Sequence, residues 1–309
     1  MKVRIITLIK FIIFVAIFYA LLAFNVFNIG ERLLPTPTDY IEIDTPEDMQ
    51  DLERISIEED NNLQIETGHW VAGNGKMFEN LCNRITICEK IYFNGSFIDT
   101  EKYNYTRIVD RIVQFINDNG NEDKKMEEVI SKIDINKGNG ERRWSVQGRD
   151  SIVFNLWFVQ SKKEFLELST HEIGHIVDLW YIQWFSFKKD KNFTEFGKVV
   201  FAIDDPSLSF YKFSRDKEKI RKAVAKKKDF CSGYGMSDPF EDLAECFNLY
   251  TNHNSFFRQV AKSNTVMKKK YNFIAGIFDG KYITSNSQDL TLIKTNSTRR
   301  PRDTTKLSN

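Results

Sequence analysis

Two histidines and a glutamate in the stretch His171-Glu172-Ile173-Gly174-His175 are residue types that build zinc sites. In a helix, His171 and His175 lie one turn apart on the same face, so both imidazoles can reach a single Zn²⁺ ion. Glu172 points toward the same cleft, where it can polarise a water molecule without binding the metal itself. The pattern H-E-x-x-H is that of metallopeptidases and predicts peptide-bond hydrolysis by water that the metal activates. The alternative is an ordinary amphipathic helix that carries two histidines by chance.

A second polar segment offers the third protein ligand that such a site needs. Ser237 or Asp238 fits the N-cap of a helix, which places Glu241 and Glu245 one turn apart on one face. We expect Glu241 to bind the zinc and Glu245 to orient a zinc-bound histidine by a hydrogen bond. Asp178, which shares the face of the two histidines, is expected to support the site in the same indirect way. The alternative for Glu241 is a capping role, because it occupies the third position of the helix.

The elements around these residues predict a mainly helical α+β domain. Ser161 and Glu164 form a capping-box pattern at the start of the helix that carries the histidines. The β-forming run at 152–159 directly before it predicts a strand whose open edge could bind an extended peptide. Further helices are expected at 101–118, at 123–133 and in a basic, solvated stretch at 215–228, and short strands at 70–71, 84–87 and 91–93.

The N-terminus carries an uncharged run, Phe11–Gly30, which is about as long as a membrane-spanning helix. Lys2, Arg4 and Lys10 precede the run, whereas the flank after it is mainly acidic. The positive-inside rule therefore predicts a cytoplasmic N-terminus and an extracytoplasmic catalytic domain. We expect residues 1–30 to be an uncleaved signal anchor that contacts the membrane, with a cleaved signal peptide and secretion as the alternative.

Five segments follow from composition: the anchor at 1–30, an acidic linker at 31–66, a small β/α region at 67–150, a catalytic region at 151–283 and a disordered tail at 284–309. The formal net charge of +1 gives no general attraction to nucleic acid. Four cysteines in an exported domain favour disulfides, and the sequence leaves all three pairings open.

Two segments together resemble the catalytic domain of anthrax lethal factor and its relatives, which include the secreted Pro-Pro endopeptidases. The resemblance lies in residues 171–178, in Tyr234-Gly235 and in residues 241–247, and it covers about residues 151–260. It implies a zincin-type fold of the gluzincin class, with His171, His175 and Glu241 as zinc ligands. Glu172 would be the general base, and Glu245 would lie beside a ligand. It also implies that Tyr234 stabilises the oxyanion of the tetrahedral intermediate. The chain shows no toxin translocation or receptor-binding module, so cleavage of host kinases is not carried over.

We therefore expect a membrane-anchored or secreted zinc endopeptidase that acts on a protein or peptide. Two alternatives stay open at this point. One is a catalytically silent zinc-binding protein of the cell surface, although such a protein need not keep Glu172 or Tyr234. The other is a zinc amidase that acts on cell-wall peptides.

Overall fold

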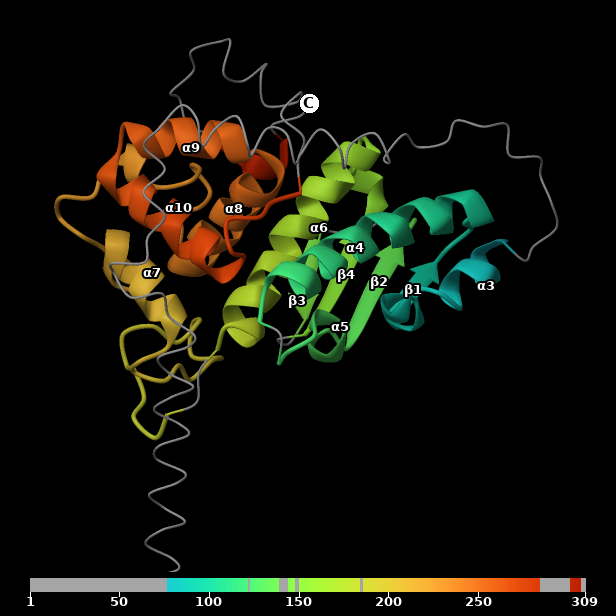
Figure 1. The fold of residues 1–309 in the computed structure, drawn as a ribbon, viewed down its shortest axis with the longest axis horizontal. Coiled ribbons are helices and arrows are strands. Elements are labelled where there is room, and N and C mark those ends of the chain that lie inside the picture. The colour runs from blue at the N-terminus through green and yellow to red at the C-terminus, as the bar shows by residue number, and fades with distance from the viewer. Residues whose placement is uncertain are drawn as a thin grey trace, which may run out of the picture. The chain divides into compact units, whose positions relative to one another are not determined.

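The computed structural model describes residues 77–121, 123–138, 144–147, 150–183, 186–283 and 301–306, all within one compact unit. Helices predominate beside two small sheets, which confirms the mixed α+β class (Figure 1). Within the described ranges, no helix combines the length and the apolar character needed to cross a membrane. The expected anchor at 1–30 and acidic linker at 31–66 lie outside these ranges.

The larger sheet has the strand order β1-β2-β4-β3. Strands β1 (Ile91–Asn94), β2 (Lys132–Asn136) and β4 (Ser151–Asn155) are parallel, and β3 (Trp144–Gln147) is antiparallel to β4. Ring contact between Phe154 of β4 and Phe165 anchors the histidine-bearing helix on this sheet, with ring centroids 5.1 Å apart. The sheet takes strands from both sides of the boundary expected at residue 150.

The sheet corrects two predictions. The strand expected at 152–159 is neither an edge nor that long: β4 pairs on both sides, and Leu156–Phe158 form the 3₁₀ turn η3. The helix expected at 123–133 is only the short helix α5 (Met126–Val129), because the chain then enters β2. In β2, the buried residues Ile133 and Ile135 alternate with more exposed neighbours, as in a strand with one buried face. This pattern outweighs the helical spacing of the apolar residues before it.

The segment before this sheet is more helical than expected. The described part begins with α3 (Met77–Cys82), and the predicted strand at 84–87 is replaced by a turn that leads into the 3₁₀ helix η2 (Thr86–Lys90). The strand expected at 91–93 is confirmed as β1, whereas Trp70 and Val71 lie outside the described residues. Helix α4 (Asp99–Asn119) confirms the prediction for 101–118.

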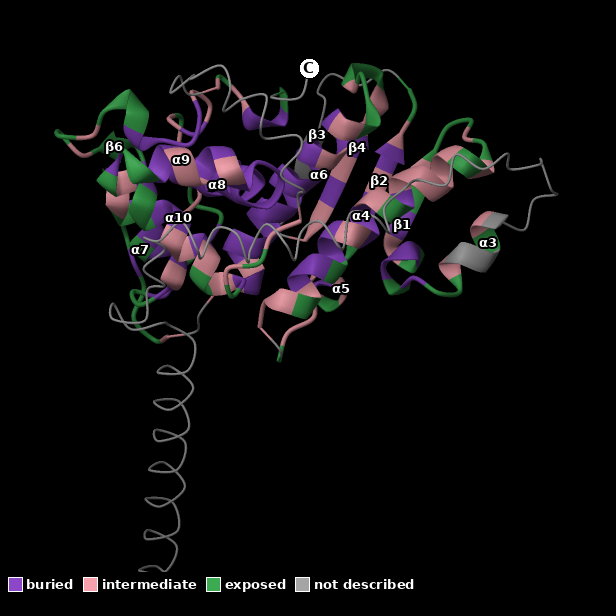
Figure 2. Ribbon diagram, turned by 45° about the horizontal axis from the view of Figure 1, so that its top comes forward, coloured by how far each residue is buried: buried purple, intermediate pink, exposed green. Residues whose placement is uncertain are grey.

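Helix α6 (Lys162–Ile176), which continues as the π-helical turn η4 (Val177–Tyr181), lies between the sheet and a group of further helices (Figures 1 and 2). These helices are α7 (Pro206–Ser214), α8 (Pro239–Asn252), α9 (Asn254–Lys262) and α10 (Thr265–Ile277). Buried residues line both α6 and α8 where these two helices pack together (Figure 2).

The basic stretch at 215–228 is not a helix. Its first half is a hairpin of β5 (Arg215–Lys217) and β6 (Ile220–Arg221), and the 3₁₀ helix η5 (Lys227–Asp229) follows. Arg215 is buried, and its guanidinium donates hydrogen bonds to the carbonyl oxygens of Glu218 (3.0 Å) and Met236 (2.7 Å). The first bond closes the hairpin and the second joins it to the loop before α8, so the arginine is not part of a solvated helix face.

Two disulfides join Cys82 to Cys88 and Cys231 to Cys246, which settles the pairing that the sequence left open. The prediction of a disordered tail is wrong for Pro301–Lys306, which is ordered and ends in the 3₁₀ helix η6 (Thr304–Lys306). Helix η6 packs on α6 and α8, and the residues before it form backbone hydrogen bonds with Gly233 and Tyr234 in the loop before α8.

Candidate metal centre

Helix α6 presents His171 and His175 to one point. The helix starts at Ser161, whose Oγ accepts a hydrogen bond from Glu164 N at 3.0 Å, as predicted; the Glu164 carboxylate turns back to Gln160 N at 2.8 Å. Ten and fourteen residues after this cap, the two imidazoles are one turn apart and buried, with ring centroids 4.9 Å apart.

Helix α8 brings Glu241 to the same point. Asp238 is the N-cap and accepts a hydrogen bond from Glu241 N at 2.9 Å, so the backbone of Glu241 takes part in capping while its side chain faces α6. Glu241 Oε2 lies 3.1 Å from His171 Nε2 and 3.4 Å from His175 Nε2. The arrangement favours the ligand role for this carboxylate over the capping-box alternative.

The three groups have the chemistry and the spacing of a zinc site. One ligand atom from each of His171, His175 and Glu241 lies within 4.8 Å of the others. Tetrahedral ligands at zinc bond lengths are separated by about 3.3 Å, close to both measured nitrogen–oxygen distances. Two imidazoles and one carboxylate, with a fourth position left for water or substrate, are the donor set of many catalytic zinc sites. The residues therefore fit the ion that the sequence predicts.

Glu172 and Tyr234, the two predicted catalytic residues, border this cluster. Glu172 is fully buried, and its Oε1 lies 3.8 Å from His171 Nε2. The Tyr234 hydroxyl donates a hydrogen bond to Glu241 Oε1 at 2.9 Å. Burial and the neighbouring carboxylate raise the pKa of the Tyr234 phenol well above its ordinary value, so the hydroxyl keeps its proton and remains a donor.

Glu245 lies beside the other ring nitrogen of His171. Its Oε1 lies 3.0 Å from His171 Nδ1, and both side chains are almost fully buried. A carboxylate at Nδ1 fixes the ring orientation and directs Nε2 toward the metal, which is the role expected of Glu245.

Asp178 lies elsewhere. Its Oδ2 accepts a hydrogen bond from the Tyr211 hydroxyl at 2.5 Å, so the structure brings it to α7 rather than to the ligand group. Burial raises the pKa of the Asp178 carboxyl to about 7, although hydrogen bonds from Ser207 and Tyr211 oppose the shift.

The charges at the centre favour a cation. Burial alone would lower the pKa of the His171 imidazole, but the carboxylates of Glu241 and Glu245 raise it well above the ordinary value. Burial alone would raise the pKa of Glu241, but the two imidazoles hold it below its usual range. Three carboxylates (those of Glu172, Glu241 and Glu245) surround two imidazoles, so a divalent ion between them would be strongly stabilised.

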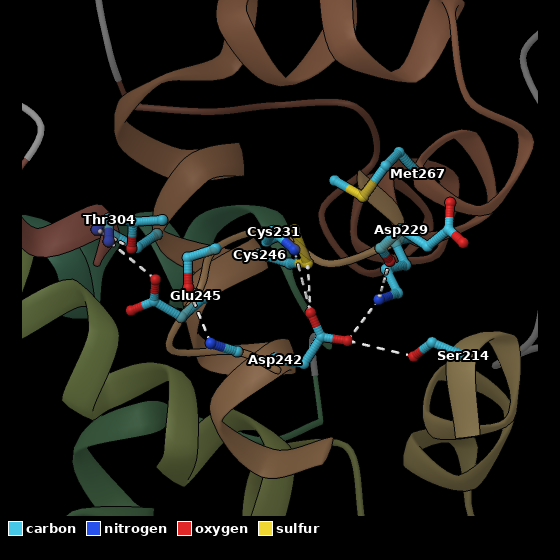
Figure 3. Close-up of a disulfide and its surroundings, with 12 residues drawn as sticks. Ser214, Asp229, Cys231, Asp242, Glu245, Cys246, Met267 and Thr304 are labelled. Carbon is cyan, nitrogen blue, oxygen red and sulfur yellow. Dashed lines mark hydrogen bonds and ion pairs between the residues drawn. A yellow bond between two sulfur atoms is a disulfide. The ribbon is translucent and has the colours of Figure 1, made fainter. Parts of the chain in front are cut away.

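A second group of potential ligands near the site is structural. Cys231, Asp242 and Cys246 lie together, but the two cysteines form a disulfide (Figure 3). Asp242 forms an ion pair with Lys270. Asp242 Oδ1 also accepts a hydrogen bond from Cys231 N at 3.2 Å. These bonds fix α8 to the segment that carries Tyr234, and they leave no thiolate for a metal.

Sequence reasoning missed the segment Pro301–Lys306. Thr304 N donates a hydrogen bond to Glu245 Oε2 at 2.8 Å, so this distant residue touches the support of a predicted zinc ligand (Figure 3). Its composition carries no sign of this, because three of the contacts use its backbone groups and the hydroxyl of Thr304 bonds to a residue far away in the sequence.

No protein-family model, no curated protein and no solved structure matches the chain.

Proposed function

We propose that this chain is a zinc-dependent endopeptidase of gluzincin type that hydrolyses bonds in a protein or peptide substrate. The observation that carries the proposal is the convergence of His171 Nε2, His175 Nε2 and Glu241 Oε2 from two helices on one point. Glu172 and Tyr234 stand beside this point, which is where a hydrolase needs a base and an oxyanion donor.

Zinc, when bound, supplies a Lewis acid that polarises the scissile carbonyl and lowers the pKa of a bound water. The protein supplies the rest. Glu172 accepts the proton of the attacking water and passes it to the leaving amine, a role for which it must not be a ligand. The protonated Tyr234 hydroxyl turns from Glu241 to the tetrahedral oxyanion and donates a hydrogen bond there. Glu245 holds His171 in the orientation that keeps Nε2 on the metal.

The sheet supports an extended polypeptide as substrate. Strand β3 stands at the end of the strand order and pairs only with β4 within the described sheet. An edge strand can bind an extended peptide by strand addition, with affinity from backbone hydrogen bonds. We therefore move the predicted peptide-binding edge from the 152–159 segment to Trp144–Gln147.

The two disulfides support an oxidising compartment. Together with the uncharged run in residues 1–30, they favour a catalytic domain outside the cytoplasm, anchored to the membrane or secreted.

The test is cleavage of a diverse peptide library by the purified full chain. The same sample is assayed as purified, after chelation, and after stoichiometric zinc is returned to the chelated sample. We expect internal cleavage that chelation abolishes and zinc restores. Cleavage that survives chelation, or one bound zinc per chain with no cleavage of any peptide, would refute the proposed activity.

A further inference from the structure

The segment Pro301–Thr304 contacts Tyr234 and Glu245, which lie beside the proposed zinc ligands. Gly233 N donates a hydrogen bond to Pro301 O, and Tyr234 N donates one to Arg302 O, both at 2.8 Å. This short pairing holds the backbone at Gly233 and Tyr234. Tyr234 is therefore fixed at its backbone by one part of the chain and at its side chain by Glu241.

Two residues later, the same segment reaches Glu245. Thr304 N donates a hydrogen bond to Glu245 Oε2 at 2.8 Å, while Glu245 Oε1 lies 3.0 Å from His171 Nδ1 (Figure 3). Thr304 and Glu245 are both fully buried, so this charge-assisted hydrogen bond is shielded from water. Thr304 thus acts on the same carboxylate that orients a proposed zinc ligand.

A buried polar network holds Thr304 in place. Asn248 Nδ2 donates a hydrogen bond to Thr304 Oγ1 at 3.0 Å, and Asn252 Nδ2 donates one to Asn248 Oδ1 at 2.7 Å. Asn252 also donates to Thr170 Oγ1 at 2.9 Å, directly before His171 in α6. The network links Thr304 to both site helices, and each buried group in it would be costly to leave unpaired.

We propose that Pro301–Thr304 is a positioning element of the metal centre. Its Thr304 N–H fixes Glu245, and through it His171, and its carbonyl oxygens fix the backbone of Gly233 and Tyr234. The inference rests on the proposed function. It predicts that zinc affinity and turnover depend on a segment that contributes neither a ligand nor a catalytic side chain. A segment that only packed against the helices would instead change the stability of the fold and leave the site unchanged.

The experiment compares four forms of the full chain: a chain that ends at Arg300, a control chain that ends at Lys306, the variant Thr304→Pro and the control variant Lys306→Pro. Thr304→Pro removes the N–H that Glu245 accepts, whereas Lys306→Pro places the same residue at an exposed position two residues later. Each form is measured for zinc affinity by chelator competition, for kcat and KM separately, and for the absorption spectrum of the cobalt-loaded protein. Circular dichroism and thermal unfolding check the fold.

The chain that ends at Arg300 and Thr304→Pro are expected to lose about 10- to 100-fold in zinc affinity or turnover, the range typical of contacts behind a metal ligand. The loss should fall on kcat rather than KM, the cobalt spectrum should change, and both controls should match the wild type. A synthetic peptide of residues 301–309 at millimolar concentration should restore the shortened chain, and the same peptide with proline in place of Thr304 should not.

Unchanged zinc affinity, kcat and spectrum in both altered forms would overturn the inference, as would equal losses in Thr304→Pro and Lys306→Pro. If the shortened chain does not fold, the comparison of the two proline variants decides. A wild-type chain that binds zinc but cleaves no peptide would refute the proposed function, while the zinc affinities would still decide the role of the segment. A wild-type chain that binds no zinc would overturn both.

Discussion

Glu241 and Glu245 are one turn apart on α8, and they contact opposite nitrogens of the same imidazole. Glu241 Oε2 faces His171 Nε2 at 3.1 Å, and Glu245 Oε1 faces His171 Nδ1 at 3.0 Å. A zinc ion bound by Nε2 would therefore lie on the side of Glu241, toward which His175 also points. At the scale of residues, the two carboxylates therefore have different roles that single substitutions can separate.

Replacing these two glutamates in turn tests the assignment. Glu245→Ala should weaken zinc binding about 10- to 100-fold, because it removes support from a ligand. Glu241→Ala should weaken it further, because it removes a ligand outright. Chelator competition on the two purified variants measures the order, and the reverse order would mean that Glu245 is the third ligand.

Tyr234→Phe tests the oxyanion role. Removing the hydroxyl should lower kcat by about 10²- to 10³-fold, because a hydrogen bond that forms in the transition state is lost. Zinc content should stay at one per chain, since the phenol is not among the proposed ligands. Steady-state kinetics on zinc-loaded protein provide the measurement, and a kcat close to that of wild type would exclude the role.

At the scale of elements, local signals predicted the two site helices well. The caps Ser161 and Asp238 lie where their sequence patterns place them, since capping depends on a few neighbouring residues. The sequence did not reveal β2, because Met126, Val129, Ile130 and Ile133 fit helical spacing as well as they fit a turn followed by a buried strand. Pairing with β1 and β4, which no local pattern records, decides between the two.

The contact between α6 and α8 depends on Gly174, which stands directly before the site residue His175. A Cβ atom at this position would lie 3.0 Å from Phe247 Cδ1 and 3.2 Å from Ala244 Cα. Gly174→Ala should therefore overpack the interface at a cost of about 1–3 kcal/mol, of which the better helix propensity of alanine offsets about 1. Urea unfolding should show a net loss of stability and, because the helices separate, weaker zinc binding.

Gly138→Ala is the control, because a Cβ atom there meets no atom of the described residues within 4 Å. Its stability should be equal to that of wild type. A Gly174→Ala protein as stable as this control would show that the interface between α6 and α8 accommodates the added methyl group, against the prediction.

At the scale of the whole molecule, distant segments converge on one centre. Helix α8 is held by the ordered Pro301–Lys306 segment and, through the disulfide Cys231–Cys246, by the loop at 231–237. The segment and the loop are also joined to each other by backbone hydrogen bonds. The serine- and threonine-rich composition of the tail predicted disorder because it offers little apolar surface. Order at 301–306 comes from backbone groups and from the Thr304 hydroxyl, which find partners only in the folded protein, so composition could not predict it.

The two disulfides should stabilise the fold unequally. In the chain-entropy description, the Cys231–Cys246 bridge, with a separation of 15, contributes about 3 kcal/mol and the Cys82–Cys88 bridge, with a separation of 6, about 2 kcal/mol. Paired Cys→Ala substitutions followed by urea unfolding measure both. A larger loss from the Cys82–Cys88 pair would contradict this ranking.

The account as a whole depends on Glu172 acting as a base beside a metal that it does not bind. The most direct measurement is zinc content and peptide cleavage on the same purified samples of wild type and Glu172→Gln. We predict one zinc per chain in both, with the cleavage rate of the variant lower by about 10²- to 10⁴-fold. Cleavage at the wild-type rate in the variant, or loss of zinc together with activity, would contradict the mechanism.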